Sequence, residues 1–301
     1  MKRRALLAVA VTAGVAASAV AFGACSLIPG AKSSPKPSAT SVAQILGHEP
    51  KGVAAKIART GQIVVANDAD YPPQSYEEDG KLVGFDVDVA EKVAALLGVQ
   101  LKFVHPVWPA VPAGLKAGSF DVSIGSMTRT TDNLRRVAMA HPYYYAQSQV
   151  VVSRGSTPIT TVEGLKGARI GAGAATTYQT FLQAVGGVDI ATYDTSAGAL
   201  HALFSGRVDG VMTADITGQR AIAKGKPVEL SGQAFYYEAM CFATRKGERD
   251  LLALLDYSVK KMRADGSLTA MAKEWYGFDA TQPPASGVPT FDGAIAQLTG
   301  Q

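Results

Sequence analysis

The chain has 301 residues, enough for two modest domains, with 47% hydrophobic and 18% charged residues. This composition supports a buried core and excludes a disordered chain. The net charge of +4 is concentrated at the start, because Lys2, Arg3 and Arg4 supply three of the 29 basic residues and leave 26 against 25 acidic ones, and a nearly neutral remainder without a basic stripe argues against a nucleic-acid partner.

Residues 1–25 have the pattern of a secretory signal peptide. The three basic residues precede 20 uncharged, apolar or small residues from Ala5 to Ala24, which is the order of a charged n-region and an apolar h-region. The run Phe22-Gly23-Ala24-Cys25 resembles a bacterial lipobox, although Phe22 stands where leucine is usual. We therefore expect an extracytoplasmic protein, anchored to the bacterial cell membrane by a lipid on Cys25. The alternative is an uncleaved anchor, since 20 residues at about 1.5 Å each just span a bilayer.

Cysteine and histidine usage predicts neither a disulfide nor a metal site. A lipidated Cys25 has no free thiol, and Cys241 lies in the apolar, strand-like run from Glu238 to Ala243, where we expect a buried small residue. No Cys/His cluster has metal-ligand spacing, because the histidines are scattered at His48, His105, His141 and His201. We expect no metal and no cofactor.

The first part after the signal indicates a linker followed by a strand and a loop. Residues 26–60 begin with a stretch rich in Ser, Pro, Lys and Ala, typical of a spacer, and one or two helical turns are expected within residues 42–59. Ile63 to Ala66 predict a buried strand that ends in a loop carrying Asp68 and Tyr71, stiffened by Pro72-Pro73. Gly84-Phe85-Asp86 then leads into a helix with Val89, Val93, Leu96 and Leu97 on one face. An α/β domain places a small-molecule site at such a strand end.

One short pattern occurs twice further along the chain. Leu115-x-x-Gly118-x-x-Asp121 precedes the strand-like run Val122 to Ser126, and Leu203-x-x-Gly206-x-x-Asp209 precedes Gly210 to Thr213. Each copy predicts a helix end, a glycine cap and a buried strand. Alternating strands and helices favour parallel sheets, so two copies predict two α/β lobes, although glycine caps before strands are common in any α/β protein.

Two strands are expected to join these lobes. Gln149 to Ser153 would leave the first lobe and Tyr236 to Ala243 would return to it, followed by helices over Leu251 to Ala264 and Leu268 to Tyr276. Three prolines between Gln282 and Thr290 indicate the end of the globular part.

The segment Asn67 to Leu97 and the final run Lys273-Glu274-Trp275-Tyr276-Gly277 resemble the polar amino-acid family of periplasmic solute-binding proteins, the ligand-capturing subunits of ABC importers. The resemblance spans Ile63 to Gly277. It implies the type II periplasmic-binding-protein fold, an α/β fold of two lobes, each a sheet flanked by helices, joined by two hinge strands. The expected boundaries are 61–150 with 242–278 for lobe one, 151–241 for lobe two, and 279–301 for a C-terminal tail.

The resemblance also implies a ligand site in a cleft between lobes that close like a hinge. Asp68 would meet a cationic end of the ligand, and Tyr71 with Trp108 would form an aromatic wall suited to a cation. Further ligand-binding groups are expected from both lobes, at Ser126, Thr128, Arg129, Thr176, Thr177 and Asp215. Several of these residues have an ordinary structural alternative: Asp68 as a turn residue, Tyr71 as a surface ring, Trp108 as a core residue, Thr176 or Thr177 as an N-cap, and Asp215 as the cap of the following helix.

Two positions depart from the family pattern. Asn133 stands where the family has an arginine that grips the α-carboxylate, and Ala214 stands where it has an aspartate that binds the α-ammonium. Because both changes affect groups that define an α-amino acid, we hypothesise a small polar or cationic metabolite that need not be a standard L-α-amino acid.

The leading functional prediction is a monomeric, lipid-anchored binding subunit that delivers its ligand to an ABC permease without catalysis. One alternative is a dehydratase-like enzyme, since some cyclohexadienyl dehydratases resemble this family. The other is a sensor that reports ligand binding to a separate membrane partner.

Overall fold

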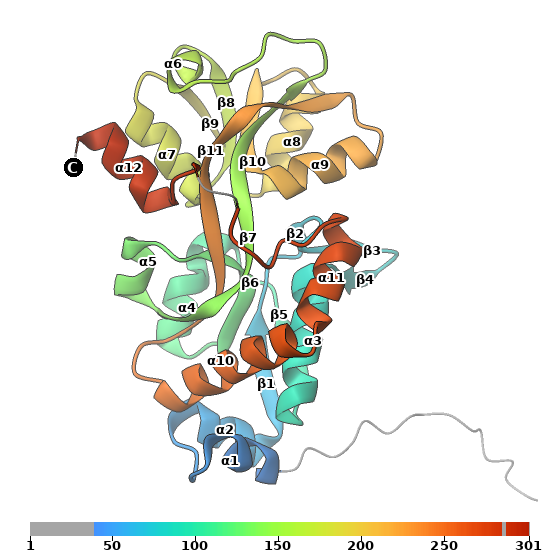
Figure 1. Ribbon diagram of the computed structural model, residues 1–301, viewed down its shortest axis with the longest axis vertical. Helices are drawn as coiled ribbons and strands as arrows, with labels where there is room; N and C mark the ends of the chain where they lie inside the picture. The colour runs from blue at the N-terminus through green and yellow to red at the C-terminus, as the bar shows by residue number, and fades with distance from the viewer. Residues whose placement is uncertain (1–38, 285–286, 301) are drawn as a thin grey trace, which may run out of the picture. The chain divides into compact units, whose positions relative to one another are not determined.

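The computed structural model describes residues 39–284 and 287–300 (Figure 1). The predicted signal peptide, its lipobox and Cys25 lie outside these residues. The main sheet has eight strands in the order β5-β1-β6-β11-β7-β10-β8-β9, and a small sheet has the order β2-β3-β4. We call the part built on β1, β5 and β6 lobe one, and the part built on β8, β9 and β10 lobe two.

Lobe one contains parallel strands covered by helices. β1 pairs in parallel with β5 and with β6, and the small sheet follows β1 directly. Its strands are β1 Gln62–Ala66, β2 Asp70–Tyr71, β3 Ser75–Glu78, β4 Lys81–Val83, β5 Gln100–Val104 and β6 Val122–Thr128. Its helices are α3 Phe85–Leu97, the 3-10 turn η1 Trp108–Ala110, α4 Val111–Ala117, α5 Thr131–Arg136, α10 Arg249–Ala264 and α11 Ser267–Tyr276. The predicted apolar face of α3 is confirmed, with Val89, Val93 and Leu97 fully buried.

Lobe two repeats this plan with fewer strands. β8 pairs in parallel with β9 and with β10. Its strands are β8 Arg169–Gly173, β9 Asp189–Tyr193 and β10 Gly210–Ala214, and its helices are α6 Val162–Leu165, α7 Thr177–Val185, α8 Ser196–Phe204 and α9 Asp215–Ala223.

The repeated sequence pattern marks equivalent positions in the two lobes. Gly118 and Gly206 have positive φ values of 74° and 67° after α4 and α8, a conformation that favours glycine. Asp121 Oδ2 accepts the backbone N–H of Val64 on β1 at 2.9 Å, and Asp209 Oδ2 accepts that of Arg169 on β8 at 2.8 Å. In both lobes the aspartate therefore accepts a hydrogen bond from a backbone N–H group of the neighbouring strand.

Two long antiparallel strands, β7 Ala138–Ser153 and β11 Val228–Thr244, run through both lobes (Figure 1). β11 pairs with β6 in lobe one, and β7 pairs with β10 in lobe two. The two connecting strands and the two-lobed α/β architecture predicted from the sequence are confirmed. Cys241 on β11 is fully buried, as predicted.

The two ends of the described chain differ from expectation. Within residues 26–60, where one or two helical turns are expected at 42–59, the helices α1 Ala39–Leu46 and α2 Gly52–Thr60 are longer than expected and pack against α10, and Val42 and Ile57 are fully buried. Within the expected tail, α12 Phe291–Thr299 packs against α7 and β11. These segments carry buried apolar side chains, so they belong to the folded core. No helix among residues 39–284 and 287–300 has the length and apolar character needed to cross a membrane.

Candidate ligand-binding site

A cavity of about 220 Å³ lies between the two lobes and is bounded by groups from both of them. Lobe one supplies the loop after β1, the turn η1, the end of β6 and the start of α5. Lobe two supplies the loop from β8 into α7 and the start of α8. The connecting strand β11 and the helix α12 complete the wall, through Glu238, Met240 and Phe291.

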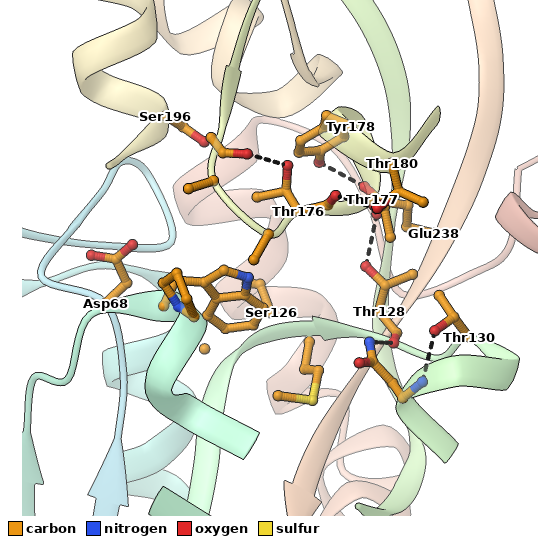
Figure 2. Close-up of a pocket in the computed structure, with 18 of the residues that line it drawn as sticks. Asp68, Ser126, Thr128, Thr130, Thr176, Thr177, Tyr178, Thr180, Ser196 and Glu238 are labelled. Atoms are coloured by element: carbon orange, nitrogen blue, oxygen red, sulfur yellow. Dashed lines mark hydrogen bonds between the residues drawn. The ribbon is translucent and has the colours of Figure 1, made fainter. Parts of the chain in front are cut away.

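Seven of the nine side chains predicted to bind ligand line this cavity, namely Asp68, Tyr71, Trp108, Ser126, Thr128, Thr176 and Thr177. They come from four segments far apart in the sequence, and Figure 2 shows Asp68, Ser126, Thr128, Thr176 and Thr177 around the same space.

Arg129 and Asp215 lie outside the lining. Arg129 is exposed, and its Nη1 donates to the backbone oxygen of Met139 at 3.4 Å. Asp215 opens α9 and is 6% exposed, and its Oδ1 accepts the backbone N–H of Gln147 at 3.0 Å. Neither side chain belongs to the described cavity wall, and each is engaged with a backbone group of β7.

Asn133 lines the cavity but is held by its own loop. Its Nδ2 donates to the backbone oxygen of Thr128 at 2.9 Å, and its N–H donates to Thr130 Oγ1, the N-cap of α5, at 3.0 Å. The side chain thus fastens the end of β6 to α5, with one amide donor already used.

Ser126 rests on a buried network confined to lobe one and its adjoining strand. It has φ of 59°, which is uncommon for a residue other than glycine. Its Oγ donates to Asp86 Oδ2 at 2.7 Å and accepts from Tyr144 at 2.7 Å, while Tyr143 donates to Asp86 Oδ1 at 2.7 Å. Burial raises the pKa of Asp86 to about 7, although the hydrogen bonds from Tyr143 and Ser126 oppose the rise.

The loop before α7 is shaped by Ala175 and Thr176. Ala175 has φ of 55°, in the left-handed region, which explains physically why a glycine suits this place. Thr176 is the N-cap of α7, since its Oγ1 accepts from Gln179 N at 3.3 Å and donates to Gly173 O at 2.8 Å. The cap interpretation of Thr176 is therefore confirmed, and the same loop faces the cavity.

Glu238 is a lining residue that sequence reasoning missed. It lies on β11, is 1% exposed, and accepts hydrogen bonds from Thr128 at 2.7 Å, from Tyr178 at 2.6 Å and from Thr177 (Figure 2). Burial raises the pKa of Glu238, while the hydrogen bonds from these three hydroxyls oppose the rise. The available signal was a single acid in the otherwise apolar run from Phe235 to Ala243.

Acidic side chains outnumber basic ones in the described lining. It contains the carboxyl groups of Asp68, Asp132, Asp194 and Glu238, and one basic side chain, Arg136. Arg136 Nη2 lies 3.1 Å from Asp132 Oδ2 in an exposed pair. Burial raises the pKa of Asp68, although the Asp70 N–H, which donates to it at 2.9 Å, lowers it. The wall therefore favours a positively charged ligand.

The helix α12 closes the remaining side. Phe291 is 8% exposed, lines the cavity, and meets the Tyr236 ring edge-on with centroids 5.2 Å apart. The neighbouring Asp292 Oδ2 accepts from the N–H and the hydroxyl of Thr131, each at 2.8 Å, at the start of α5. Because α12 packs on α7 of lobe two, this contact links the two lobes beside the cavity.

Comparison with known proteins agrees with this arrangement. Residues 63–278 match the family model described as bacterial extracellular solute-binding proteins, family 3. The L-cystine-binding protein TcyJ of Escherichia coli (strain K12) is 31% identical over 236 residues, which cover 77% of this chain and 89% of that protein.

Solved structures show the same fold. An ancestral arginine-binding protein bound to arginine superimposes with a TM-score of 0.69 at 31% identity, covering 72% of this chain and 99% of that one. The ancestral amino acid-binding protein AncCDT-1, a precursor of cyclohexadienyl dehydratase, gives 0.71 at 27% identity, covering 75% and 100%. α12 lies beyond the last residue of the family match.

Proposed function

This chain belongs to the bacterial extracellular solute-binding proteins, family 3, and from this premise we propose that it captures a polar amino acid or a related small cationic metabolite between its lobes. The cavity lined by both lobes carries the proposal. Asp68 would meet the cationic end of the ligand, and the rings of Tyr71 and Trp108 would pack on its side chain, since aromatic faces attract cations.

Closure of the lobes is the proposed means of capture. The lobes are connected by β7 and β11, and small rotations in two such strands open or close a cleft without disturbing either core. A ligand that contacts Asp68 from lobe one and the α7 loop from lobe two at the same time would bind the closed form more tightly than the open form. Such a ligand would therefore stabilise the closed form.

We propose that the closed protein delivers its ligand to an ABC permease as a monomer. The names of its relatives, which include an L-cystine-binding protein and an arginine-binding protein, support amino acids and their close analogues as the ligand class. Residues 1–25 would direct export, and a lipid on Cys25 would hold the protein at the membrane. The substitution Cys25→Ala should move the protein from the membrane fraction to the soluble fraction, and continued membrane association would contradict the lipid anchor.

Binding without catalysis is part of the proposal, although a structural neighbour is a dehydratase precursor. Elimination from an anionic substrate needs a positioned acid and a cationic clamp. Among the described lining residues the single Lys or Arg is Arg136, and it is paired with Asp132. These observations favour capture over chemistry.

The decisive experiment is a thermal-shift screen of the purified full chain against L-amino acids, amines, betaines and small organic acids. A ligand that binds only the folded state stabilises it by about 2.7 kcal/mol at 100 times its Kd. We expect a concentration-dependent rise in Tm with a cationic or polar compound, and a smaller rise in the Asp68→Asn variant. No shift with any compound would contradict the proposed function.

A further inference from the structure

We propose that Glu238 is a specificity-determining residue that occupies the anion-binding corner of the cavity, so that the site selects organic cations lacking a carboxylate at that end over the matching amino acids. The inference rests on the proposed function and names its substrate class more narrowly.

The groups at this corner are the ones that would otherwise bind an anionic ligand. The N-terminus of α7 presents backbone N–H groups with a partial positive charge. The hydroxyls of Thr177, at the first position of α7, and of Thr128, at the end of β6, would add two donors. Sequence reasoning assigned both threonines to the ligand.

In the structure these donors are already used by the protein. Thr128 and Thr177 both donate to Glu238 Oε1, and Tyr178 donates to Oε2 at 2.6 Å. A hydroxyl has one proton to donate, so none of the three can give that proton to a ligand carboxylate at the same time. Glu238 is 1% exposed, so water contributes little to the solvation of its carboxyl group.

A second carboxylate at this corner would lie beside the Glu238 carboxyl group in a buried setting, where each of the two groups disfavours the charged form of the other. The described lining holds one cation, Arg136, which pairs with Asp132 at 3.1 Å, and Asn133 carries no charge. A ligand ammonium would instead be favoured at this corner, because it can donate a hydrogen bond to the Glu238 carboxyl group. A carboxylate offers about four acceptor sites and Glu238 uses three of them, so one remains for an N–H group.

The test uses pairs of compounds that differ only in the α-carboxylate: L-arginine and agmatine, L-lysine and cadaverine, L-histidine and histamine. Calorimetric titration of the full chain should give tighter binding of the amine in every pair that binds. Glu238→Gln should move the affinity ratio toward the amino acid by fivefold or more, while Glu238→Asp, which retains the charge, should keep the amine preference. Glu78→Gln on β3, where the carboxylate pairs with Lys224 at 3.7 Å, removes an acid outside the lining and should leave the ratio unchanged.

Tighter binding of the amino acid in any pair, or a ratio that Glu238→Gln leaves within fivefold, would overturn the inference while solute capture stands. Absence of binding by both members of all three pairs would overturn it, whereas capture fails only if the full panel is also silent. The preference for the amine over the amino acid is measured on the unmodified protein. This measurement therefore tests the inference even if Glu238→Gln does not fold.

Discussion

Asp86 and Glu238 are two buried carboxylates that solve the same physical problem in different parts of the molecule. Each is almost inaccessible to solvent and is satisfied by hydroxyl donors. The donors to Asp86, Ser126 and Tyr143, come from β6 and the lobe-one end of β7. The donors to Glu238 come from β6 of lobe one and from α7 of lobe two. The same chemistry therefore stabilises one lobe in the first case and joins two lobes around a cavity in the second.

The largest effect is expected at Asp86, through pH. The pKa is raised from 3.8 to about 7, so the contribution of this group to stability is fully present below pH 4 and is lost as pH rises through 7. At about 1.4 kcal/mol per pKa unit the full loss approaches about 4 kcal/mol, of which about 2–3 kcal/mol falls between pH 5 and pH 8. Urea unfolding at pH 5 and pH 8 should show this slope in the native chain and a weaker one in Asp86→Asn. Equal slopes would contradict the assignment, and Asp279→Asn at an exposed site is the control.

A change at Glu238 should act on binding more than on stability. Burial raises its pKa, and a cationic ligand prefers the ionised form, so the affinity for agmatine should fall as pH decreases through that pKa. A tenfold loss corresponds to about 1.4 kcal/mol. Titrations at pH 5 and pH 8 should show a smaller pH effect in Glu238→Gln. Part of it should persist, because burial also raises the pKa of Asp68 in the same cavity. An unchanged pH effect would show that Glu238 does not face the ligand.

A smaller effect is expected at Asp292, which links α12 to the start of α5 through Thr131. Asp292→Ala removes a contact that resembles a helix cap, worth about 1 kcal/mol. Small-angle scattering of the ligand-free protein should show a larger radius of gyration, and agmatine affinity should weaken about fivefold or less. Gln297→Ala, on the exposed side of the same helix, should change neither quantity. If the two variants behave alike, the contact does not hold the lobes together.

The smallest effect is expected where α9 of lobe two meets the small sheet of lobe one. The Arg220 guanidinium lies 4.7 Å from the centre of the Tyr76 ring and donates to its hydroxyl. Such a partly exposed contact contributes about 0.5–1 kcal/mol, so Arg220→Met should weaken agmatine binding less than about fivefold. Lys224→Met, which removes an exposed ion pair to Glu78, should have almost no effect. A larger loss for Arg220→Met than for Asp292→Ala would reverse the order proposed for the cross-lobe contacts.

Much of this site followed from local sequence signals. Asp68 and Tyr71 stood out because a buried strand ends just before them, and Thr176 because a threonine suits the N-cap of the helix that follows it. Loops at the carboxyl ends of parallel strands meet at one edge of each sheet, so these residues converge wherever two such lobes face each other. Local sequence patterns of this kind therefore predict which residues lie close together in space.

Arg129 and Asp215 show the limit of that reasoning. Both lie in the right loops, but the direction of a side chain depends on the backbone groups that compete for it. Arg129 meets the Met139 oxygen and Asp215 meets the Gln147 N–H, partners contributed by β7 that a pattern within one loop does not contain.

The sequence by itself determined the two α/β lobes and their repeated Gly and Asp positions, because glycine caps, buried strands and hydrophobic periodicity act over a few residues, and the family resemblance implied the loops that face the cavity. Only the tertiary structure decided that Glu238 takes the hydroxyls of Thr128 and Thr177, and that Phe291 closes the wall from beyond the family match. The hydrogen bonds of Glu238 join residues about 60 to 110 positions apart in the sequence. Both sets of contacts depend on how the two lobes and the terminal helix pack. Local propensity carries no information about such packing.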